Sequence, residues 1–138
     1  MIIRYAEEAD RASWLRLDRH LPEGAFARKA AAGEALILEE AGEGLAVLRW
    51  GLFWDSIPFC YLLYVAEGAR FRGLGRALTE HWEGEMRARG FGLTMTSTQA
   101  DENAQHFWRK LSYRDCGGFV LPFPGYEQPT ELILAKAL

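Results

Sequence analysis

Three arginines and two glycines lie close together at residues 70–76, in the order Arg-Phe-Arg-Gly-Leu-Gly-Arg. An apolar run, Tyr61 to Val65, precedes this segment, and a helix-like stretch, Ala77 to Arg89, follows it. Glycine lets the backbone approach a ligand closely, and the first N–H groups of a helix attract anions. Positive charge is concentrated here in a chain whose formal charge is -3. The segment therefore predicts a turn that binds a phosphorylated group such as a pyrophosphate, although a tight turn with solvated arginines is the simpler alternative.

Two common phosphate-binding motifs do not fit this segment. A Walker loop ends in Gly-Lys-Ser or Gly-Lys-Thr, and that ending is absent here. A dinucleotide fingerprint needs a third Gly or Ala where this chain has Leu78, and an acidic residue about 20 positions later. The strand-like segment at residues 93–98 contains no acid. Most nucleoside triphosphate sites and a standard dinucleotide site are therefore disfavoured.

The segment does match the pattern R/Q-x-x-G-x-G/A, with Arg70, Gly73 and Gly75 at its specified positions. A second segment, Asp101 to Tyr113, is similar to the pattern N-x-x-A-x-x-F-Y-x-K-L-G-F/Y. In this order and spacing, the two motifs resemble those of the GNAT family of acyl-CoA-dependent N-acyltransferases, most strongly over residues 60–115. The resemblance implies acetyl-coenzyme A as cosubstrate and a primary amine as acceptor.

The resemblance also implies which residues hold coenzyme A. In the family, main-chain N–H groups of the turn bind the pyrophosphate, and the preceding strand hydrogen-bonds the pantetheine arm. The residues implied for these roles are Val65, Arg70, Phe71, Arg72, Gly73, Leu74, Gly75 and Arg76. Asp101 stands where the family often has asparagine, so it can cap the next helix but cannot donate as an amide does. Asn103 is the alternative donor, and Arg109 and Lys110 either reach coenzyme phosphates or form a solvated face.

Trp108 stands where the family usually has the tyrosine that protonates the departing thiolate. An indole N–H can donate a hydrogen bond, but it is far too weak an acid to release its proton in catalysis. By its position in the motif, Trp108 is also among the residues implied to bind coenzyme A, although its place on an apolar helical stripe favours packing in the core. The remaining candidates for the proton donor are Tyr113, Tyr64 and water.

Acetyl transfer also needs a group that removes a proton from the acceptor amine, directly or through water. Asp55 and Glu67 flank the strand that ends at Val65, although a surface charge is the simpler explanation for each. Three aromatic residues, Trp50, Phe53 and Trp54, precede Asp55 and are candidates to line an acceptor pocket.

Hydrophobic periodicity and turn residues, together with the resemblance, predict one α/β domain over residues 1–138. We expect a mixed, mostly antiparallel central sheet of six or seven strands with about four helices. The expected strands are residues 2–6, 35–39, 45–54, 58–65, 92–98, 117–123 and 131–138, and the expected helices are 7–21, 25–35, 74–89 and one capped by Asp101. By the resemblance, the parallel strands at 61–65 and 93–98 splay to form a slot for pantetheine.

Composition restricts the other functional classes. A length of 138 residues suits one compact domain, and neither a signal peptide nor a long apolar run is evident, so we expect a cytoplasmic protein without a membrane anchor. A pI near 5.6 argues against nucleic-acid binding. Cys60 and Cys116 have no metal-binding spacing, so we expect no metal and two buried or half-buried free thiols.

The function predicted from these features is N-acetyl transfer from acetyl-CoA to a primary amine by direct attack in a ternary complex. The acceptor is an amine on a small molecule, a peptide or a protein terminus. Because Trp108 replaces the usual tyrosine, an acyl-CoA-binding sensor with little or no transferase activity is the main alternative. A nucleotide-binding domain of another type is a third. A homodimer contact through aromatic residues at 50–54 or 119–126 also stays open.

Overall fold

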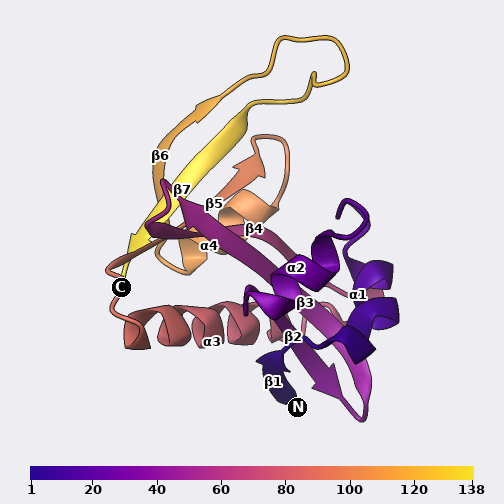
Figure 1. Cartoon of the computed structure of the whole chain (residues 1–138). Coiled ribbons are helices and arrows are strands. Elements are labelled where there is room, and N and C mark those ends of the chain that lie inside the picture. Colours follow the sequence, from indigo (N-terminus) through magenta and orange to yellow (C-terminus); the bar gives the residue numbers. More distant parts are fainter.

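The computed structural model describes residues 1–138, which form one seven-stranded sheet with helices on both faces (Figure 1). The strand order is β1-β2-β3-β4-β5-β7-β6, and only the β4–β5 pair is parallel. The strands are β1 (Ile2–Tyr5), β2 (Ala35–Glu40), β3 (Glu43–Phe53), β4 (Ile57–Val65), β5 (Leu93–Gln99), β6 (Arg114–Phe119) and β7 (Glu131–Ala137). The helices are α1 (Arg11–Leu17), α2 (Ala25–Ala31), α3 (Leu74–Ala88) and α4 (Ala104–Lys110), with 3-10 turns at Glu8–Asp10 and Glu67–Ala69. The predicted mixed, mostly antiparallel α/β sheet is confirmed.

The sheet has a hydrophobic core on each face. On one face, Trp14 of α1 and Phe26 of α2 pack against the sheet with their ring centroids 5.5 Å apart. On the other face, α3 and α4 cover the larger core. Leu78, Trp82 and Met86 are fully buried there, as their four-residue spacing on one side of α3 requires.

The parallel pair β4–β5 opens at its carboxyl ends. The register pairs Phe59 with Met95 and Cys60 with Thr96, and pairing stops there. On the other side of β4, Arg49 pairs with Leu62 while Trp50 pairs with Cys60, so Tyr61 has no partner on β3. Such a β-bulge bends its strand. Residues 61–65 therefore diverge from β5, and the predicted splay is confirmed.

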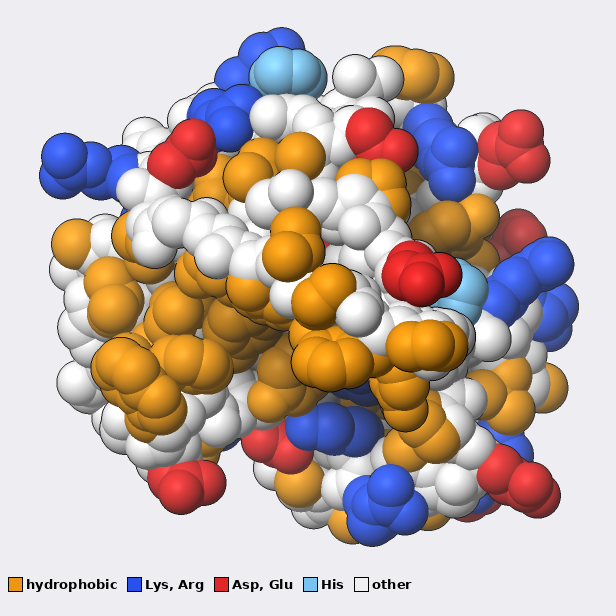
Figure 2. All heavy atoms as spheres, turned by 90° about the horizontal axis from the view of Figure 1, so that it is seen from above, with side chains coloured by type: hydrophobic (Ala, Val, Ile, Leu, Met, Phe, Trp, Pro, Cys, Tyr) orange, Lys and Arg blue, Asp and Glu red, His pale blue; other side chains and the backbone are white.

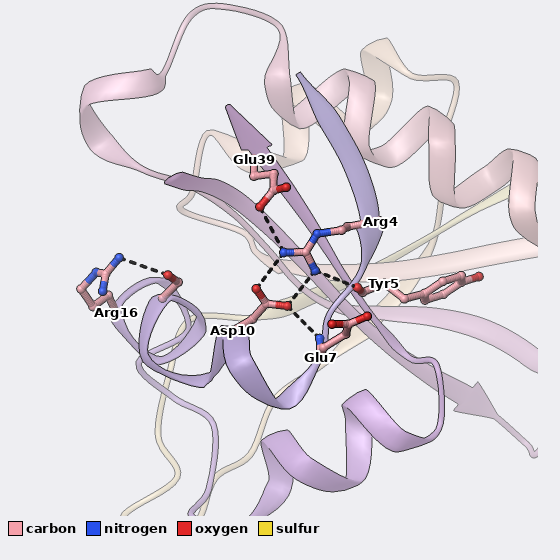
Figure 3. Close-up of polar contacts among 7 residues, drawn as sticks. Arg4, Tyr5, Glu7, Asp10, Arg16 and Glu39 are labelled. Atoms are coloured by element: carbon pink, nitrogen blue, oxygen red, sulfur yellow. Dashed lines mark hydrogen bonds and ion pairs between the residues drawn. The ribbon is translucent and has the colours of Figure 1, made fainter. Parts of the chain in front are cut away.

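An ion-pair cluster attaches the N-terminal strand to the turn before α1 (Figure 3). The Arg4 guanidinium lies 2.8 Å from Asp10 and 3.1 Å from Glu39 of β2. Asp10 also accepts a hydrogen bond from the Glu7 backbone N–H at 2.7 Å. Arg4 holds the pKa of Asp10 below its usual value, mainly through the side-chain hydrogen bond. The cluster thereby joins β1, β2 and the helical segment.

Several element boundaries differ from the sequence-based expectation. The helix expected at 7–21 is a 3-10 turn followed by α1, which ends at Leu17. Asp18 is buried after it and accepts hydrogen bonds from Trp14 Nε1 at 3.1 Å and Arg49 Nε at 2.8 Å. These contacts hold the Asp18 side chain inside the protein directly after the end of α1. The strand expected at 117–123 is instead β6, which begins at Arg114 and contains a register shift between Asp115 and Gly118.

Candidate active site

The turn between β4 and α3 presents unpaired backbone donors. Gly73 is the N-cap of α3 and has a left-handed φ of 75°, which glycine adopts without strain. The N–H groups of Phe71, Arg72 and Gly73 donate to no backbone oxygen in the chain. The first N–H groups of α3 lack intrahelical acceptors by helix geometry, and no side chain caps them. The turn therefore has the donors that an anion requires.

A cavity of about 340 Å³ lies between this turn and α4. Its lining residues are Val65, Ala69, Arg70, Phe71, Gly73, Leu74, Gly75, Arg76, Phe107, Lys110 and Leu111. A Cβ at Gly75 would lie 3.4 Å from Val65 Cγ2 and 3.6 Å from Phe107. The absent side chain thus leaves room where strand, turn and α4 meet. Seven of the eight turn and strand residues predicted for coenzyme A line this cavity; the eighth, Arg72, does not.

Each arginine of the turn already has a partner. Arg70 Nε donates to the Val65 carbonyl at 3.1 Å, and its guanidinium lies 5.3 Å from the centroid of the Tyr64 ring. Arg72 pairs with Glu40 at 2.7 Å. Arg76 pairs with Glu80 at 2.8 Å. The last two pairs are solvent-exposed and hence weak, so their cations are free to move to a bound anion.

The open edge of β4 offers further backbone groups. The Ala66 N–H donates to Leu45 of β3 at 2.8 Å. The backbone N–H and C=O groups of successive residues point to alternate sides of a strand. Those of Tyr64 therefore also point toward β3, and those of Leu63 and Val65 point toward the slot. The Val65 carbonyl that accepts from Arg70 agrees with this direction. Sequence reasoning assigned Val65 and missed Leu63, which the two-residue period of the strand identifies.

Trp108 is a core residue, as its helical stripe indicated. Its side chain is 4% exposed, and its ring packs edge-on against Tyr113 with centroids 4.9 Å apart. It does not line the cavity, where Phe107 of the same helix lies instead. Phe107 was not among the residues expected to bind coenzyme A. The structure therefore places the adjacent aromatic residue at the site.

Tyr113 belongs to a buried polar network. Its hydroxyl donates to Glu83 at 2.8 Å and lies 3.0 Å from Thr94 Oγ1. Lys136 Nζ lies 2.9 Å from the other Glu83 oxygen. Burial is the main reason that the pKa of Tyr113 is well above its usual value, and the Glu83 charge adds to this effect. These contacts argue against Tyr113 as the proton donor and for a role in joining α3, β5 and β7.

The other candidate catalytic side chains do not converge. Tyr64 is half-buried against the core beneath α1 and α2. Asp55 is exposed in the β3–β4 turn, separated from Val65 by the length of β4, roughly 30 Å. Glu67 is exposed at the other end of that strand, beside the cofactor turn. Of the two carboxylates, only Glu67 lies at the cavity end of β4.

Asp101 does not cap α4, which corrects the expectation. The N-cap is Asn103, and it makes no side-chain capping bond. The Gln105 side chain instead donates to the carbonyls of Ala100 and Glu102 at 2.8 and 2.9 Å. Asp101 and Asn103 are both exposed and lie outside the cavity lining. A glutamine inside the helix thus satisfies the carbonyl groups of the preceding turn.

Tyr61 lies at the bulge, at the end of the slot that is farther from the coenzyme A turn. Its ring is 49% exposed, stacks near Phe59 with centroids 5.5 Å apart, and lies 5.1 Å from Lys29 Nζ. The ring covers Gly51, where any Cβ would overlap it. Lys29 in turn binds Glu34 at 3.1 Å and the Trp50 carbonyl at 2.8 Å. Sequence reasoning missed this contact because it joins three distant segments.

Exposed apolar side chains gather on the adjoining face. Figure 2 shows them around a hollow, on the side from which the β6–β7 loop rises in Figure 1. The exposed large apolar side chains of the β3–β4 hairpin and of the segment from the end of β6 through the β6–β7 loop are Leu52, Phe53, Trp54, Tyr61, Phe119, Val120, Phe123 and Tyr126. Trp50, by contrast, is buried. Phe53 and Trp54 thus remain candidates for the acceptor wall, and Trp50 belongs to the core.

Neither cysteine resembles a nucleophile or a metal ligand. Cys60 is buried, which raises the pKa of its thiol to about 12. Cys116 is exposed, contrary to the expectation of two buried or half-buried thiols. No group of three or more His, Cys, Asp or Glu side chains is arranged to hold a metal ion. No helix has both the length and the apolar character to span a bilayer.

Comparison with known proteins identifies one matching family model and several solved structures with a similar fold. The model of the acetyltransferase (GNAT) family matches residues 2–113. The ribosomal-protein-alanine N-acetyltransferase of Brucella melitensis is 20% identical with a TM-score of 0.82, and the alignment covers 100% of both chains. The ribosomal-protein-S18-alanine N-acetyltransferase of Escherichia coli is 19% identical with a TM-score of 0.77, covering 99% of this chain and 92% of that one.

A third similar structure is Arabidopsis thaliana Naa50 in complex with the bisubstrate analogue CoA-Ac-MVNAL. It is 14% identical, with a TM-score of 0.82, covering 99% of this chain and 98% of that one. No curated protein matches the sequence. At these identities the structures establish the fold, and the family model establishes the membership. The chain belongs to the acetyltransferase (GNAT) family.

Proposed function

We propose that the protein is a single-domain N-acetyltransferase that transfers acetyl from acetyl-CoA to a primary amine by direct attack in a ternary complex. The observation that carries the proposal is the cavity at the open end of the β4–β5 slot, beside the turn in which the N–H groups of Phe71, Arg72 and Gly73 have no backbone partner. A diphosphate suits these donors because a helix N-terminus favours negative charge. Family membership supports the same assignment.

The pantetheine arm lies in the slot as an additional strand and hydrogen-bonds the free edge of β4 at Leu63 and Val65. Pairing between β4 and β5 stops at Cys60, so the thioester comes to lie near the bulge at Tyr61. The acceptor amine approaches from the α2 face, where Tyr61 is half exposed beside Lys29. The apolar side chains around the neighbouring hollow favour an acceptor that carries an apolar group next to its amine.

The amine nitrogen attacks the thioester carbonyl carbon, a C–N bond forms, and the carbonyl oxygen gains negative charge. The C–S bond then breaks, coenzyme A leaves as the thiolate, and the amine loses a proton. Water in the open slot receives that proton, because Glu67 lies beside the diphosphate turn, roughly 20 Å along β4 from the bulge at Tyr61. Water protonates the thiolate, because Tyr113 is buried in its network with Glu83 and Tyr64 packs against the core beneath α1 and α2.

The proposal is tested by acetyl-CoA turnover with a panel of small primary amines and peptides that carry free N-termini. Released thiol reports the reaction, and mass spectrometry identifies the acetylated product. A thermal-shift series with coenzyme A, acetyl-CoA, ATP and NAD tests the cosubstrate independently, because only a ligand of the folded state raises the melting temperature. Stabilisation by ATP or NAD and not by coenzyme A would favour another nucleotide-binding class.

The acyl-CoA sensor is the second candidate, and the burial of Trp108 at the family's tyrosine position favours it. A sensor would bind acetyl-CoA tightly and release no thiol with any amine. Trp108→Tyr would also leave a sensor inactive. Turnover in the wild type excludes the sensor, since it shows that this chain transfers acetyl without a phenol at residue 108.

A further inference from the structure

The side chain of Phe71 is exposed, and its backbone is strained. Its side chain is 104% exposed, the highest value among the exposed large apolar residues. Its φ of 63° lies in the left-handed region, which is costly for a residue that has a Cβ. Full exposure of an aromatic ring and a left-handed backbone both raise the free energy of the protein. No contact within the chain offsets either, so a bound partner is the natural source of compensation.

The position of Phe71 indicates which part of a ligand it meets. Phe71 lines the same cavity as Arg76, Phe107 and Lys110. In coenzyme A, the diphosphate joins pantetheine to an adenosine that carries a 3′-phosphate. If the turn holds the diphosphate and the pantetheine runs along β4, the adenosine must leave on the solvent side of the turn. Phe71 is the exposed aromatic ring on that side, and Arg76 and Lys110 supply positive charge near the phosphates.

We propose that the Phe71 ring stacks on the adenine base of coenzyme A, an inference that rests on the proposed function. Stacking buries one face of the ring and compensates for the strained backbone. Base–aromatic stacking requires only a π-face and a geometry that exposes the ring before binding. A fully exposed aromatic side chain on a turn whose backbone holds the diphosphate meets both requirements.

The test compares binding of three ligands to wild type and Phe71→Ala by isothermal titration calorimetry. Phe71→Ala removes the ring and keeps a Cβ at the strained position. Coenzyme A and 3′-dephospho-coenzyme A contain adenine, whereas 4′-phosphopantetheine does not. We expect Phe71→Ala to weaken binding of both adenine-containing ligands about fivefold or more and to leave 4′-phosphopantetheine unchanged. Phe71→Trp keeps a stacking surface and should bind like wild type. Phe123→Ala, which removes another exposed ring on the β6–β7 loop, serves as the matched control.

Phe71→Gly separates the backbone from the ring. Glycine relieves the left-handed strain, so the melting temperature of the free protein should rise by about 4 °C, while coenzyme A affinity falls as in Phe71→Ala. Equal affinity of wild type and Phe71→Ala for coenzyme A would overturn this inference alone. An equal loss for 4′-phosphopantetheine would also overturn it, because the ring would then act through the turn and not through adenine. A wild type that binds no coenzyme A would overturn the proposed function as well.

Discussion

The Cβ position of Gly75 lies 3.4 Å from Cγ2 of Val65, so the first turn of α3 and the last residue of β4 meet with no side chain between them. Phe107 of α4 lies 3.6 Å from the same position. The strand before the turn, the helix after it and the more distant α4 therefore meet at one glycine. The size of the residue at position 75 controls the space available to a ligand between the turn and α4.

Gly75→Val should abolish stabilisation by coenzyme A with little change in the fold. The valine side chain fills the space beside Val65 and Phe107, whereas its backbone conformation in a helix remains allowed. A thermal-shift titration with coenzyme A measures the effect, and circular dichroism reports the fold.

Gly84→Ala is the matched control, since a Cβ at this position of α3 meets nothing within 4 Å. Alanine in a helix interior is favoured over glycine by about 0.5–1 kcal/mol, so this variant should be slightly more stable and bind coenzyme A normally. Normal coenzyme A binding by Gly75→Val would contradict the placement of the ligand in this cavity.

Tyr113→Phe separates a structural from a catalytic role for this phenol. The substitution removes one donor from buried Glu83 and one partner from Thr94. We expect a loss of about 1–3 kcal/mol in the free energy of unfolding, because a buried carboxylate loses a hydrogen bond. The value of kcat at a temperature where the variant is folded should stay within a factor of about two, since the proton comes from water. A fall of about 100-fold in kcat would identify Tyr113 as the acid after all.

Glu40→Gln should strengthen coenzyme A binding by releasing Arg72. Arg72 NH2 lies 2.7 Å from Glu40, and both side chains are close to half exposed. Removal of the competing carboxylate leaves the guanidinium available to the phosphates, for a gain of about twofold to fivefold in affinity at low salt. Calorimetry at two ionic strengths measures this gain, which salt should diminish.

Glu43→Gln provides the comparison for Glu40→Gln. Glu43 lies in the same β2–β3 hairpin and, together with Glu40 and Arg72, lines a second cavity of about 470 Å³. It makes no ion pair with Arg72. An equal gain from both variants would indicate a general reduction of negative charge and not the release of one arginine.

The pH dependence of stability should carry the signature of Asp10. Its pKa is lowered in the folded protein by Arg4, so the folded state favours the carboxylate more than the unfolded state does. The resulting stabilisation is fully present above the ordinary pKa of 3.8 and is lost as the pH falls through the lower folded pKa. Asp10→Asn should lower the free energy of unfolding by about 1 kcal/mol at pH 7. The difference from wild type should shrink below pH 4, as denaturant titrations at several pH values can measure. A constant difference across that range would contradict the assignment.

The sequence alone determined the features that depend on short-range pattern. The glycines at 73 and 75, between an apolar strand and an amphipathic helix, specify the turn and its free N–H groups because backbone conformation there is local. The spacing of Leu78, Trp82 and Met86 likewise fixes the buried side of α3. The apolar helical stripe around Trp108 likewise indicated that its indole packs in the core, although the motif also placed it among the coenzyme A residues.

Only the tertiary structure decided which distant groups meet. The contact of Phe107 with the turn, the position of Tyr61 over Gly51 and the network of Tyr113 with Glu83 each join separate elements. The bulge at Tyr61 depends on the register of β3 against β4, and the exposure of Phe71 depends on what surrounds the turn. Such contacts depend on long-range packing and on strand register. Both are decided by free-energy differences between complete arrangements of the chain, so no short stretch of sequence reveals them.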